Sequence, residues 1–374
     1  MARHDSSANP QVAFFLPHLG GGGTEKMVVT LANGLSARGY AVDMVLVQAV
    51  GMYLETLSKK IRVVDLNAKN SYLAVPGLMA YLRRCRPQVL VSSLSLTNVL
   101  ALIAARLARS HTRVAIRVES TVSAQRRTPW KKALEKPLLS WVYPWADRII
   151  AVSGVVAADA AQYLSIERAK IDIIYNPVLT AEHQTASVPR PAHPWFAPGC
   201  PPVILAAGRL APVKDFATLI TAFAELHRRR LAHLMILGEG EERSSLLSLA
   251  RELNVVDDVE LPGFTPDSYA FMKSCEAFVL SSLYEGLPTV LIEALASGCA
   301  VISTDCPGGA REILADGAYG DLVPVGDAKS MAAAIERILD GDRKHVDPAW
   351  LNQFRLETVL EQNIRILGLP PVQR

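Results

Sequence analysis

Short apolar runs alternate with longer stretches of helical periodicity along almost the whole chain. The runs at 12–16 and 203–207 are continuous and apolar, as expected of strands buried on both faces of a parallel sheet. Between such runs, apolar residues recur at spacings of three and four, which is typical of helices with one buried face. The alternation predicts an α/β protein with doubly wound parallel sheets.

The expected strands cover residues 12–16, 41–47, 61–65, 89–91, 113–118, 148–152, 171–174, 203–207, 234–237, 256–261, 278–280, 300–303 and 321–323. The expected helices cover residues 25–38, 75–85, 97–108, 130–143, 154–164, 215–230, 241–253, 288–297, 309–315 and 327–340.

The alternation stops between Thr180 and Pro202, where the chain is polar, rich in proline and without periodicity, as an interdomain linker would be. We therefore expect two Rossmann-like domains that face each other across a cleft, at residues 1–185 and 200–345. Residues 346–374 form a helical tail, which packs on its own domain or crosses back to the first.

With 374 residues, of which 50% are apolar, the chain can fill two cores. The N-terminus is polar and lacks the apolar core of a secretory signal, which favours a cytoplasmic location. Residues 87–105 carry no charge, but polar residues interrupt them, so we expect a strand and a helix there instead of a membrane span. Five dispersed cysteines without a Cys-x-x-Cys pair argue against a disulfide framework or a zinc site.

The charge is unevenly distributed along the chain. Residues 1–180 carry 22 basic and 11 acidic residues, whereas residues 181–374 carry 17 basic and 25 acidic residues. Within region 126–145, basic residues stand beside Trp130, Trp141 and Trp145, a combination that suits an anionic membrane surface. A solvated basic helix with inward-packed tryptophans is an alternative; nucleic acid is a weaker one, because no recognition module is present.

Two carboxylates stand eight positions apart in the segment from Ser281 to Gly298. Glu285 falls in a loop after an expected strand, and Glu293 falls in the helix that follows. The first turn of that helix offers unpaired N–H groups to a diphosphate, and the carboxylates can accept hydrogen bonds from ribose and sugar hydroxyls. The alternative is a solvated loop residue and a surface helix residue.

Arg209 and Lys214 lie in the loop after the expected strand 203–207. The planar guanidinium of an arginine can donate two parallel hydrogen bonds to phosphate oxygens, and the ammonium of a lysine adds a point charge. Alternatively, the two residues are only surface cations. A glycine-rich loop that includes Gly22 and Gly23 follows the first strand and lets backbone approach a ligand, unless it is only a flexible turn. It matches neither a dinucleotide fingerprint nor a P-loop.

No Asp-x-Asp stands at a strand end, and no His pair has ligand spacing. Arg209 and Lys214 can neutralise a leaving diphosphate without a divalent ion. We therefore expect neither a metal nor another cofactor.

The segments Gly208-Arg209 and Lys214-Asp215, the turn at Gly238–Gly240 and the stretch from Glu285 to Glu293 resemble the retaining GT-B glycosyltransferases of family 4. The resemblance extends over nearly the whole chain. It implies that Arg209 and Lys214 bind the donor diphosphate, that Glu293 binds the ribose, and that Glu285 lies at the reacting face of the donor sugar. Arg209, Lys214 and Glu285 would then be the catalytic residues.

The resemblance implies further donor contacts: Gly22 and Gly23 on the sugar, the amides of Thr289 and Val290 on phosphate, and Gly263 and Phe264 at the base. One departure concerns a histidine that touches the donor sugar in many relatives. Here the chain reads Arg117-Val118-Glu119-Ser120, so Glu119 is the candidate contact.

We therefore expect a retaining glycosyltransferase that moves a sugar from a nucleotide-diphosphate sugar, expected to be a UDP-sugar. The acceptor would be a glycan or a lipid-linked glycan in envelope polysaccharide or lipopolysaccharide synthesis, with the protein in the cytoplasm or peripheral on the inner face of the cytoplasmic membrane. A sugar-nucleotide epimerase and a non-catalytic sugar-nucleotide-binding protein are the alternatives.

Overall fold

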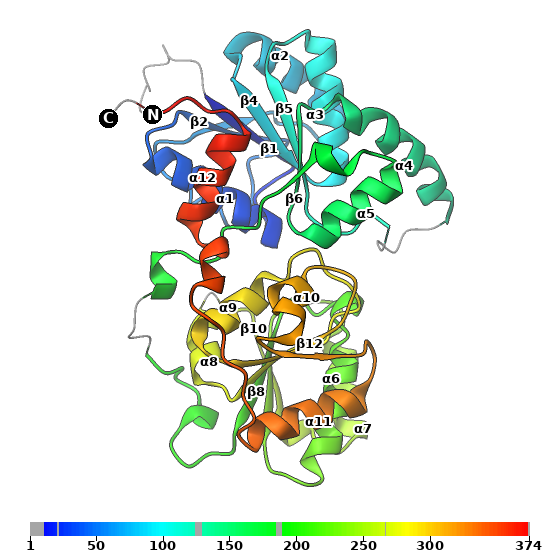
Figure 1. Cartoon of the computed structure of the whole chain (residues 1–374), viewed down its shortest axis with the longest axis vertical. Coiled ribbons are helices and arrows are strands. Elements are labelled where there is room, and N and C mark those ends of the chain that lie inside the picture. Colours follow the sequence, from blue (N-terminus) through cyan, green and yellow to red (C-terminus); the bar gives the residue numbers. More distant parts are fainter. Residues whose placement is uncertain (1–10, 21, 124–128, 185–188, 266, 373–374) are drawn as a thin grey trace. The chain divides into compact units, whose positions relative to one another are not determined.

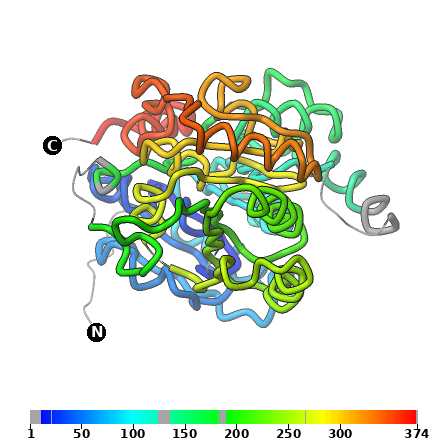
Figure 2. The backbone as a smooth tube through the Cα atoms, turned by 90° about the horizontal axis from the view of Figure 1, so that it is seen from below, coloured from blue at the N-terminus to red at the C-terminus, as the bar shows by residue number. Residues whose placement is uncertain are grey.

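The computed structural model describes residues 11–20, 22–123, 129–184, 189–265 and 267–372, which divide into two compact units (Figures 1 and 2). The first unit comprises the described residues up to Pro177 together with those from Phe354 onwards. The second unit comprises Val178–Gln353. Each unit contains one parallel sheet, which confirms the predicted pair of doubly wound α/β domains.

The first unit has a seven-stranded sheet in the order β3-β2-β1-β4-β5-β6-β7. Its strands are β1 (Val12–Leu16), β2 (Val42–Leu46), β3 (Arg62–Asp65), β4 (Val89–Ser93), β5 (Arg113–Val118), β6 (Arg148–Ala151) and β7 (Ile171–Ile173). Its helices are α1 (Gly23–Ala37), α2 (Val75–Cys85), α3 (Ser95–Ala108), α4 (Pro129–Val142), α5 (Gly154–Leu164) and α12 (Leu356–Ile366).

The second unit has a six-stranded sheet in the order β10-β9-β8-β11-β12-β13. Its strands are β8 (Val203–Ala207), β9 (His233–Leu237), β10 (Val259–Gly263), β11 (Ala277–Leu280), β12 (Ala300–Thr304) and β13 (Asp321–Val323). Its helices are α6 (Phe216–His227), α7 (Arg243–Glu252), α8 (Ser268–Ser274), α9 (Thr289–Ser297), α10 (Ala310–Ile313) and α11 (Ala328–Leu339).

Strands β1 and β8 are apolar along their whole length, as expected of strands in a parallel sheet with helices on both faces. All five residues of β1 are buried, and the same holds for β8. In the second unit, α6 and α11 lie side by side and pack a shared core through residues such as Phe223 and Ile335 (Figures 1 and 2). The helices thus fix the strand ends at which the loops of a ligand site begin.

The end of the chain packs on the first unit. Helix α12 lies against α1 (Figure 1), where a Cβ placed on Gly34 would come within 2.7 Å of Leu360 Cδ1. The glycine therefore permits the close approach of the two helices. The tail is not one helix, since Arg355 is extended (φ −74°, ψ 142°) between the 3₁₀ helix Trp350–Phe354 and α12.

The unit boundaries differ from those expected from the sequence. The described part of the expected linker belongs to the second unit, where His193 Nε2 lies 2.8 Å from Glu260 Oε2 and Phe196 is buried. Residues 346–353 also belong to that unit, and Trp350 Nε1 donates to the Ile313 carbonyl at 2.9 Å. Side-chain contacts attach both segments to the second unit, and such contacts cannot be predicted from the periodicity of the sequence.

Two local features differ from the expected elements. Helix α8 was not anticipated; its N-cap residue is Asp267, whose carboxylate accepts from the Ala270 N–H at 3.3 Å. Residues Val256–Asp258 form a 3₁₀ turn, so the expected strand 256–261 becomes β10 and ends at Gly263. Helix α8 has seven residues and the 3₁₀ turn has three, and segments this short show too little hydrophobic periodicity to be predicted.

The uncharged stretch 87–105 forms β4 and most of α3, as expected. Across the described ranges, none of the helices combines the length and the apolar character that a membrane span requires.

The segment before β8 packs on His233, the first residue of β9, and the protonation of this histidine is linked to folding. The His233 ring stacks on Trp195, with centroids 4.2 Å apart and planes 4° from parallel. Its Nδ1 lies 3.1 Å from an Asp258 carboxylate oxygen. Burial lowers the pKa of His233 and outweighs the opposing effect of Asp258.

This lowered pKa predicts that acid destabilises the second unit. As pH falls through about 6.5, the unfolded chain takes up the proton before the folded one, so the free energy of unfolding decreases. We expect a smaller loss in His233→Gln between pH 7.5 and 5.5, measured by urea unfolding, with the exposed His111→Gln as control. An equal or larger loss in His233→Gln contradicts the assignment.

Candidate active site

The strand order of the second unit brings two loops together. After β8 the chain adds β9 and β10 on one side, and it then returns to place β11 on the other side of β8. The loops that follow β8 and β11 therefore begin on adjacent strands, and the chain leaves these strands in opposite directions along the sheet. This is a topological switch point, where open α/β sheets bind ligands. Arg209 and Lys214 follow β8, and Glu285 follows β11.

An ion pair joins these two loops. Lys214 Nζ lies 2.6 Å from Glu285 Oε1, and the two side chains are only 19% and 13% exposed. The Ser282 hydroxyl donates to the same carboxylate oxygen at 2.6 Å. Glu285 is thus a half-buried, oriented carboxylate, and the alternative of a solvated loop residue is wrong.

Backbone contacts fix the same junction. The Ser281 hydroxyl donates to the Lys214 carbonyl at 2.7 Å, and the Leu283 N–H donates to the Val213 carbonyl at 2.8 Å. Because these bonds hold the main chain on both sides, the ammonium and the carboxylate are positioned before any ligand arrives.

Arg209 lies on the same loop as Lys214 and is exposed. Within the described part of the chain, its guanidinium makes neither a hydrogen bond nor an ion pair. Its donor fork is therefore available to an anion, in contrast to the partnered Lys214.

Helix α9 contributes its first turn and Glu293. Pro288 is the N-cap residue, and no side chain caps the helix. The N–H groups of Thr289 and Val290 have no acceptor within the helix, because the first turn lacks preceding carbonyls. Glu293 is only 5% exposed, so it is not the surface residue that the alternative interpretation required.

Two glycines allow loops to approach the site closely. Gly308 has φ 141°, and a Cβ there would lie 2.4 Å from the Glu285 carbonyl oxygen. Gly238 has φ 139°, and a Cβ there would lie 1.9 Å from the Gly208 carbonyl oxygen. The Glu285 N–H donates to the Pro307 carbonyl at 2.9 Å, so the 307–309 turn closes on the Glu285 loop.

The expected base-binding residues lie at the end of β10: Gly263 is its last residue, and Phe264 follows it. The Gly263 carbonyl accepts from the Gly238 N–H at 2.8 Å, which ties this loop to the end of β9. Phe264 is 59% exposed, so its ring is accessible. This loop is separated from the Lys214 loop by one strand, β9.

The remaining expected residues lie in the first unit. Gly22 is the N-cap residue of α1, and a Cβ there would lie 2.2 Å from Glu25 Oε2; Gly23 begins the helix and has open space around it. Glu119 follows β5, and its carboxylate lies 2.9 Å from Arg117 Nε. These residues belong to a separate compact unit from Glu285 and Glu293.

The region expected at a membrane lies only partly within the described residues. Residues 124–128, which include Arg126 and Arg127, are outside them, and nothing is described of the side chains at 129–134. On the described part of α4, Leu138 and Trp141 are 43% and 65% exposed. The alternative with inward-packed tryptophans is therefore wrong for Trp141.

Some participants were missed from the sequence. The sequence does not indicate that Ser282 is a partner of Glu285, or that Gly308 permits the close approach of the 307–309 turn to Glu285. Cys306 is also buried nearby, where burial, and then the charge of Glu285, raises the pKa of its thiol to about 11. Only long-range contacts reveal these roles.

Among the residues that the structure describes, no group of three or more His, Cys, Asp or Glu side chains is placed to hold a metal ion.

Comparisons with known proteins match both units. The family described as "Glycosyl transferases group 1" matches residues 193–349, and "Glycosyltransferase Family 4" matches residues 21–182. The N-acetylgalactosamine-N,N'-diacetylbacillosaminyl-diphospho-undecaprenol 4-alpha-N-acetylgalactosaminyltransferase of Campylobacter jejuni is 33% identical over 344 residues, which cover 89% of this chain and 91% of that relative.

Two solved structures share the fold. Alr3699/HepE of Anabaena, in complex with UDP, has a TM-score of 0.78 at 18% identity, over 96% of this chain and 99% of that one. The apo form of the lipopolysaccharide outer core galactosyltransferase WaaB has a TM-score of 0.74 at 20% identity, again over 96% and 99%. Both the sequence relatives and the fold agree with the predicted resemblance, and this chain belongs to glycosyltransferase family 4, with the GT-B fold.

Proposed function

We propose that this glycosyltransferase moves a sugar from a UDP-sugar to a glycan or lipid-linked acceptor, with retention at the anomeric carbon and without a metal ion. The pathway would be the assembly of an envelope polysaccharide or lipopolysaccharide. The observation that carries the proposal is the set formed at the β8–β11 switch point by Arg209, the Lys214–Glu285 pair and the first turn of α9.

Each part of that set matches one part of a nucleotide-diphosphate sugar. Arg209 and Lys214 bind the diphosphate together with the amides of Thr289 and Val290, because cations and a helix N-terminus both favour anions. Glu293 accepts hydrogen bonds from the ribose. Glu285 faces the donor sugar, and Gly263 and Phe264 hold the base.

The chemistry follows from charge. As the bond between the sugar and the diphosphate breaks, negative charge grows on the leaving phosphate and positive charge grows on the sugar ring. Arg209 and Lys214 stabilise the negative charge on the phosphate, and the Glu285 carboxylate stabilises the positive charge on the sugar ring. Because the Glu285 carboxylate is already oriented, it does not have to reorganise during the reaction. The acceptor hydroxyl approaches the same face that the diphosphate leaves, which retains the configuration.

The relatives support the substrate classes. The HepE structure contains UDP, which favours a UDP-linked donor here. The name of the Campylobacter relative describes an acceptor sugar on diphospho-undecaprenol, which favours a lipid-linked acceptor.

A lipid-linked acceptor would bring the protein to the inner face of the cytoplasmic membrane. The exposed Trp141 and Leu138 on α4 support such contact, since an interfacial helix buries apolar side chains beside basic ones. Region 126–145 would bind the anionic surface, and no nucleic acid would be involved.

The first prediction from the proposed function concerns Arg209. In Arg209→Ala, affinity for the preferred donor in a panel of UDP- and GDP-sugars should fall about tenfold or more, because a charge-assisted contact to phosphate is lost. Donor turnover should fall roughly 10²- to 10³-fold, as when one transition-state donor is removed. Calorimetry and nucleotide release measure the two effects.

The exposed Arg228→Ala at the end of α6 is the matched control, with expected wild-type behaviour. Wild-type affinity and turnover in Arg209→Ala would remove the diphosphate role. Absence of binding to every sugar nucleotide by the wild-type protein would overturn the proposed function.

The second prediction concerns Glu293. In Glu293→Gln, affinity for UDP should fall about tenfold, because a carboxylate is the stronger acceptor for the ribose hydroxyls. Affinity for 2′,3′-dideoxy-UDP should be low and equal in both proteins, since that ligand lacks the hydroxyls. A similar loss for both ligands would assign Glu293 a purely structural role.

The third prediction concerns the membrane. The full chain should sediment with vesicles that contain anionic lipid at low salt, and high salt should release it. Trp141→Ser should weaken binding, whereas Leu231→Ser, which changes a residue 71% exposed on the second unit, should not. Lack of sedimentation at low salt would contradict the membrane contact.

A further inference from the structure

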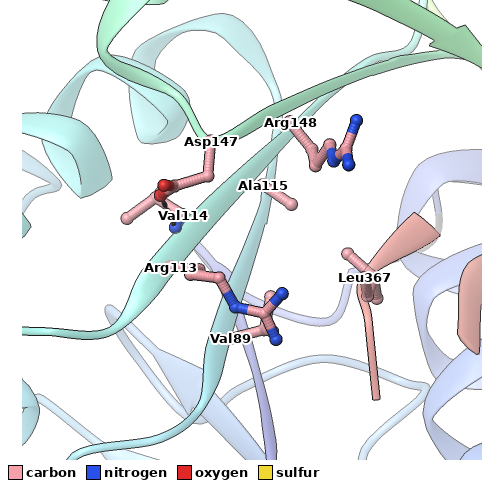
Figure 3. A pocket seen from close by; sticks show the side chains of 7 residues that line it. All are labelled: Val89, Arg113, Val114, Ala115, Asp147, Arg148 and Leu367. Carbon is pink, nitrogen blue, oxygen red and sulfur yellow. Dashed lines mark hydrogen bonds between the residues drawn. The ribbon is translucent and has the colours of Figure 1, made fainter. Parts of the chain in front are cut away.

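The first unit contains a cavity of about 190 Å³ at the amino ends of β4, β5 and β6 (Figure 3). At the roughly 30 Å³ that one water occupies, it has room for a small ion with part of its water. Its lining includes Arg113, Arg148 and Leu367, the last from the end of the chain. The residues that we assign to the donor diphosphate belong to the other unit, so this cavity is not part of that site.

The pleat of the sheet separates the charges that line the cavity. Arg113 and Ala115 are two positions apart on β5 and share a face, and Ala115 pairs with Arg148 on β6. Asp147 precedes Arg148 and therefore points to the other face, where its Oδ2 accepts from the Val114 N–H at 2.7 Å. Figure 3 shows the two guanidinium groups on the side of Leu367 and the Asp147 carboxylate beside Val114 on the other side.

Both guanidinium groups have donors that the protein does not use. Arg113 Nη2 donates to the Gly368 carbonyl at 3.3 Å, and Arg113 makes no ion pair in the described part of the chain. Arg148 Nη1 lies 3.9 Å from Asp172 Oδ2, which is too long for a hydrogen bond. A guanidinium carries five N–H donors, so most of those on the two arginines are available to a ligand.

The end of the chain orients Arg113. Leu367 and Leu369 are buried, and Gly368 between them has φ 59°. A Cβ on Gly368 would lie 2.8 Å from Arg113 Nη1, so the glycine leaves room for the guanidinium. Because the packed tail holds this group before a ligand arrives, binding costs less side-chain entropy.

The ends of helices do not account for the two arginines. Arg86 and Arg109 are the C-cap residues of α2 and α3, where unpaired carbonyls attract cations. Arg113 and Arg148 instead begin strands, and sheets have only small net dipoles. The loose contact with Asp172 balances only one of the two charges.

The donors select the ligand. Guanidinium groups donate and never accept, so two of them on one wall call for an anion. A carboxylate has two oxygens, which one guanidinium can occupy completely. The tetrahedral oxygens of a phosphate group can accept from two guanidinium groups at once.

We propose that Arg113 and Arg148 form a site for a phosphate group at this edge of the first sheet, and that the bound group strengthens the packing of the tail through Arg113. The proposal goes beyond the transfer reaction and does not depend on it. The phosphate group belongs either to a free phosphate ion or to a lipid headgroup.

The experiment titrates the full chain with inorganic phosphate and follows the line width of the phosphorus NMR signal. The wild type should bind phosphate. In Arg113→Lys and in Arg148→Lys the affinity should fall about tenfold, because an ammonium cannot donate two parallel hydrogen bonds. Sulfate, which has the same tetrahedral shape, should compete, whereas acetate at the same concentration should not.

Arg109→Lys is the matched control, since Arg109 is exposed in the same unit and does not line the cavity. It should bind phosphate like the wild type. Absence of phosphate binding, or equal affinity in the wild type and both cavity variants, overturns the proposal. Binding that is lost in Arg209→Ala but kept in Arg113→Lys and Arg148→Lys would place the ion at the proposed donor site, which also overturns it.

Hydrogen exchange tests the effect on the tail. The Leu367 and Leu369 N–H groups donate to the Asn363 and Ile364 carbonyls, and phosphate should slow their exchange in the wild type but not in Arg113→Lys. Unchanged exchange at saturating phosphate contradicts the role in tail packing. Should Arg113→Lys not fold, the affinity of Arg148→Lys decides whether the site exists.

Sedimentation with vesicles that contain phosphatidic acid separates the two sources of the phosphate group. If the lipid headgroup supplies it, both cavity variants bind these vesicles more weakly than the wild type and Arg109→Lys, and inorganic phosphate competes. If the free ion supplies it, the four proteins sediment equally.

Discussion

The half-buried ion pair between Lys214 and Glu285 is the interaction on which the candidate site depends. It joins residues 71 positions apart, on loops that leave neighbouring strands at the switch point of the second sheet. Removal of the two charges from water is costly, and Ser282 donates a further hydrogen bond to the same Oε1 atom of Glu285. Such a pair contributes less to stability than to geometry, since it places a cation and an anion at a fixed separation.

The surrounding backbone explains why this geometry holds without a ligand. The Ser281 hydroxyl and the Leu283 N–H bind the main chain of the Lys214 loop, and Gly308 lets a third loop close on Glu285. Arg209 differs, because it is exposed and unpaired in the described part of the chain. The site therefore combines a rigid charge pair with one adaptable cation, which suits a diphosphate that changes charge during the reaction.

The strands, the loops and the candidate residues of this site were predicted from the sequence, whereas the contacts between those residues were not. Continuous apolar runs located β8 and β11, and the loops after them contained Arg209, Lys214 and Glu285 as expected. The pairing of Lys214 with Glu285 and Ser282 could not be predicted, since no local pattern encodes a contact between distant loops. For the same reason, the packing of His193 and Trp195 on the second unit was missed, and α8 was too short to show periodicity.

A double-mutant cycle on Lys214 and Glu285 tests the central claim most directly. The affinity for UDP-sugar is measured calorimetrically in the wild type, Lys214→Met, Glu285→Gln and the double variant. If the pair acts as one unit, the losses are non-additive, with a coupling of about 1 kcal/mol or more. Additive losses, within about 0.3–0.5 kcal/mol, would contradict the account, because the two loops would then contribute to donor binding independently.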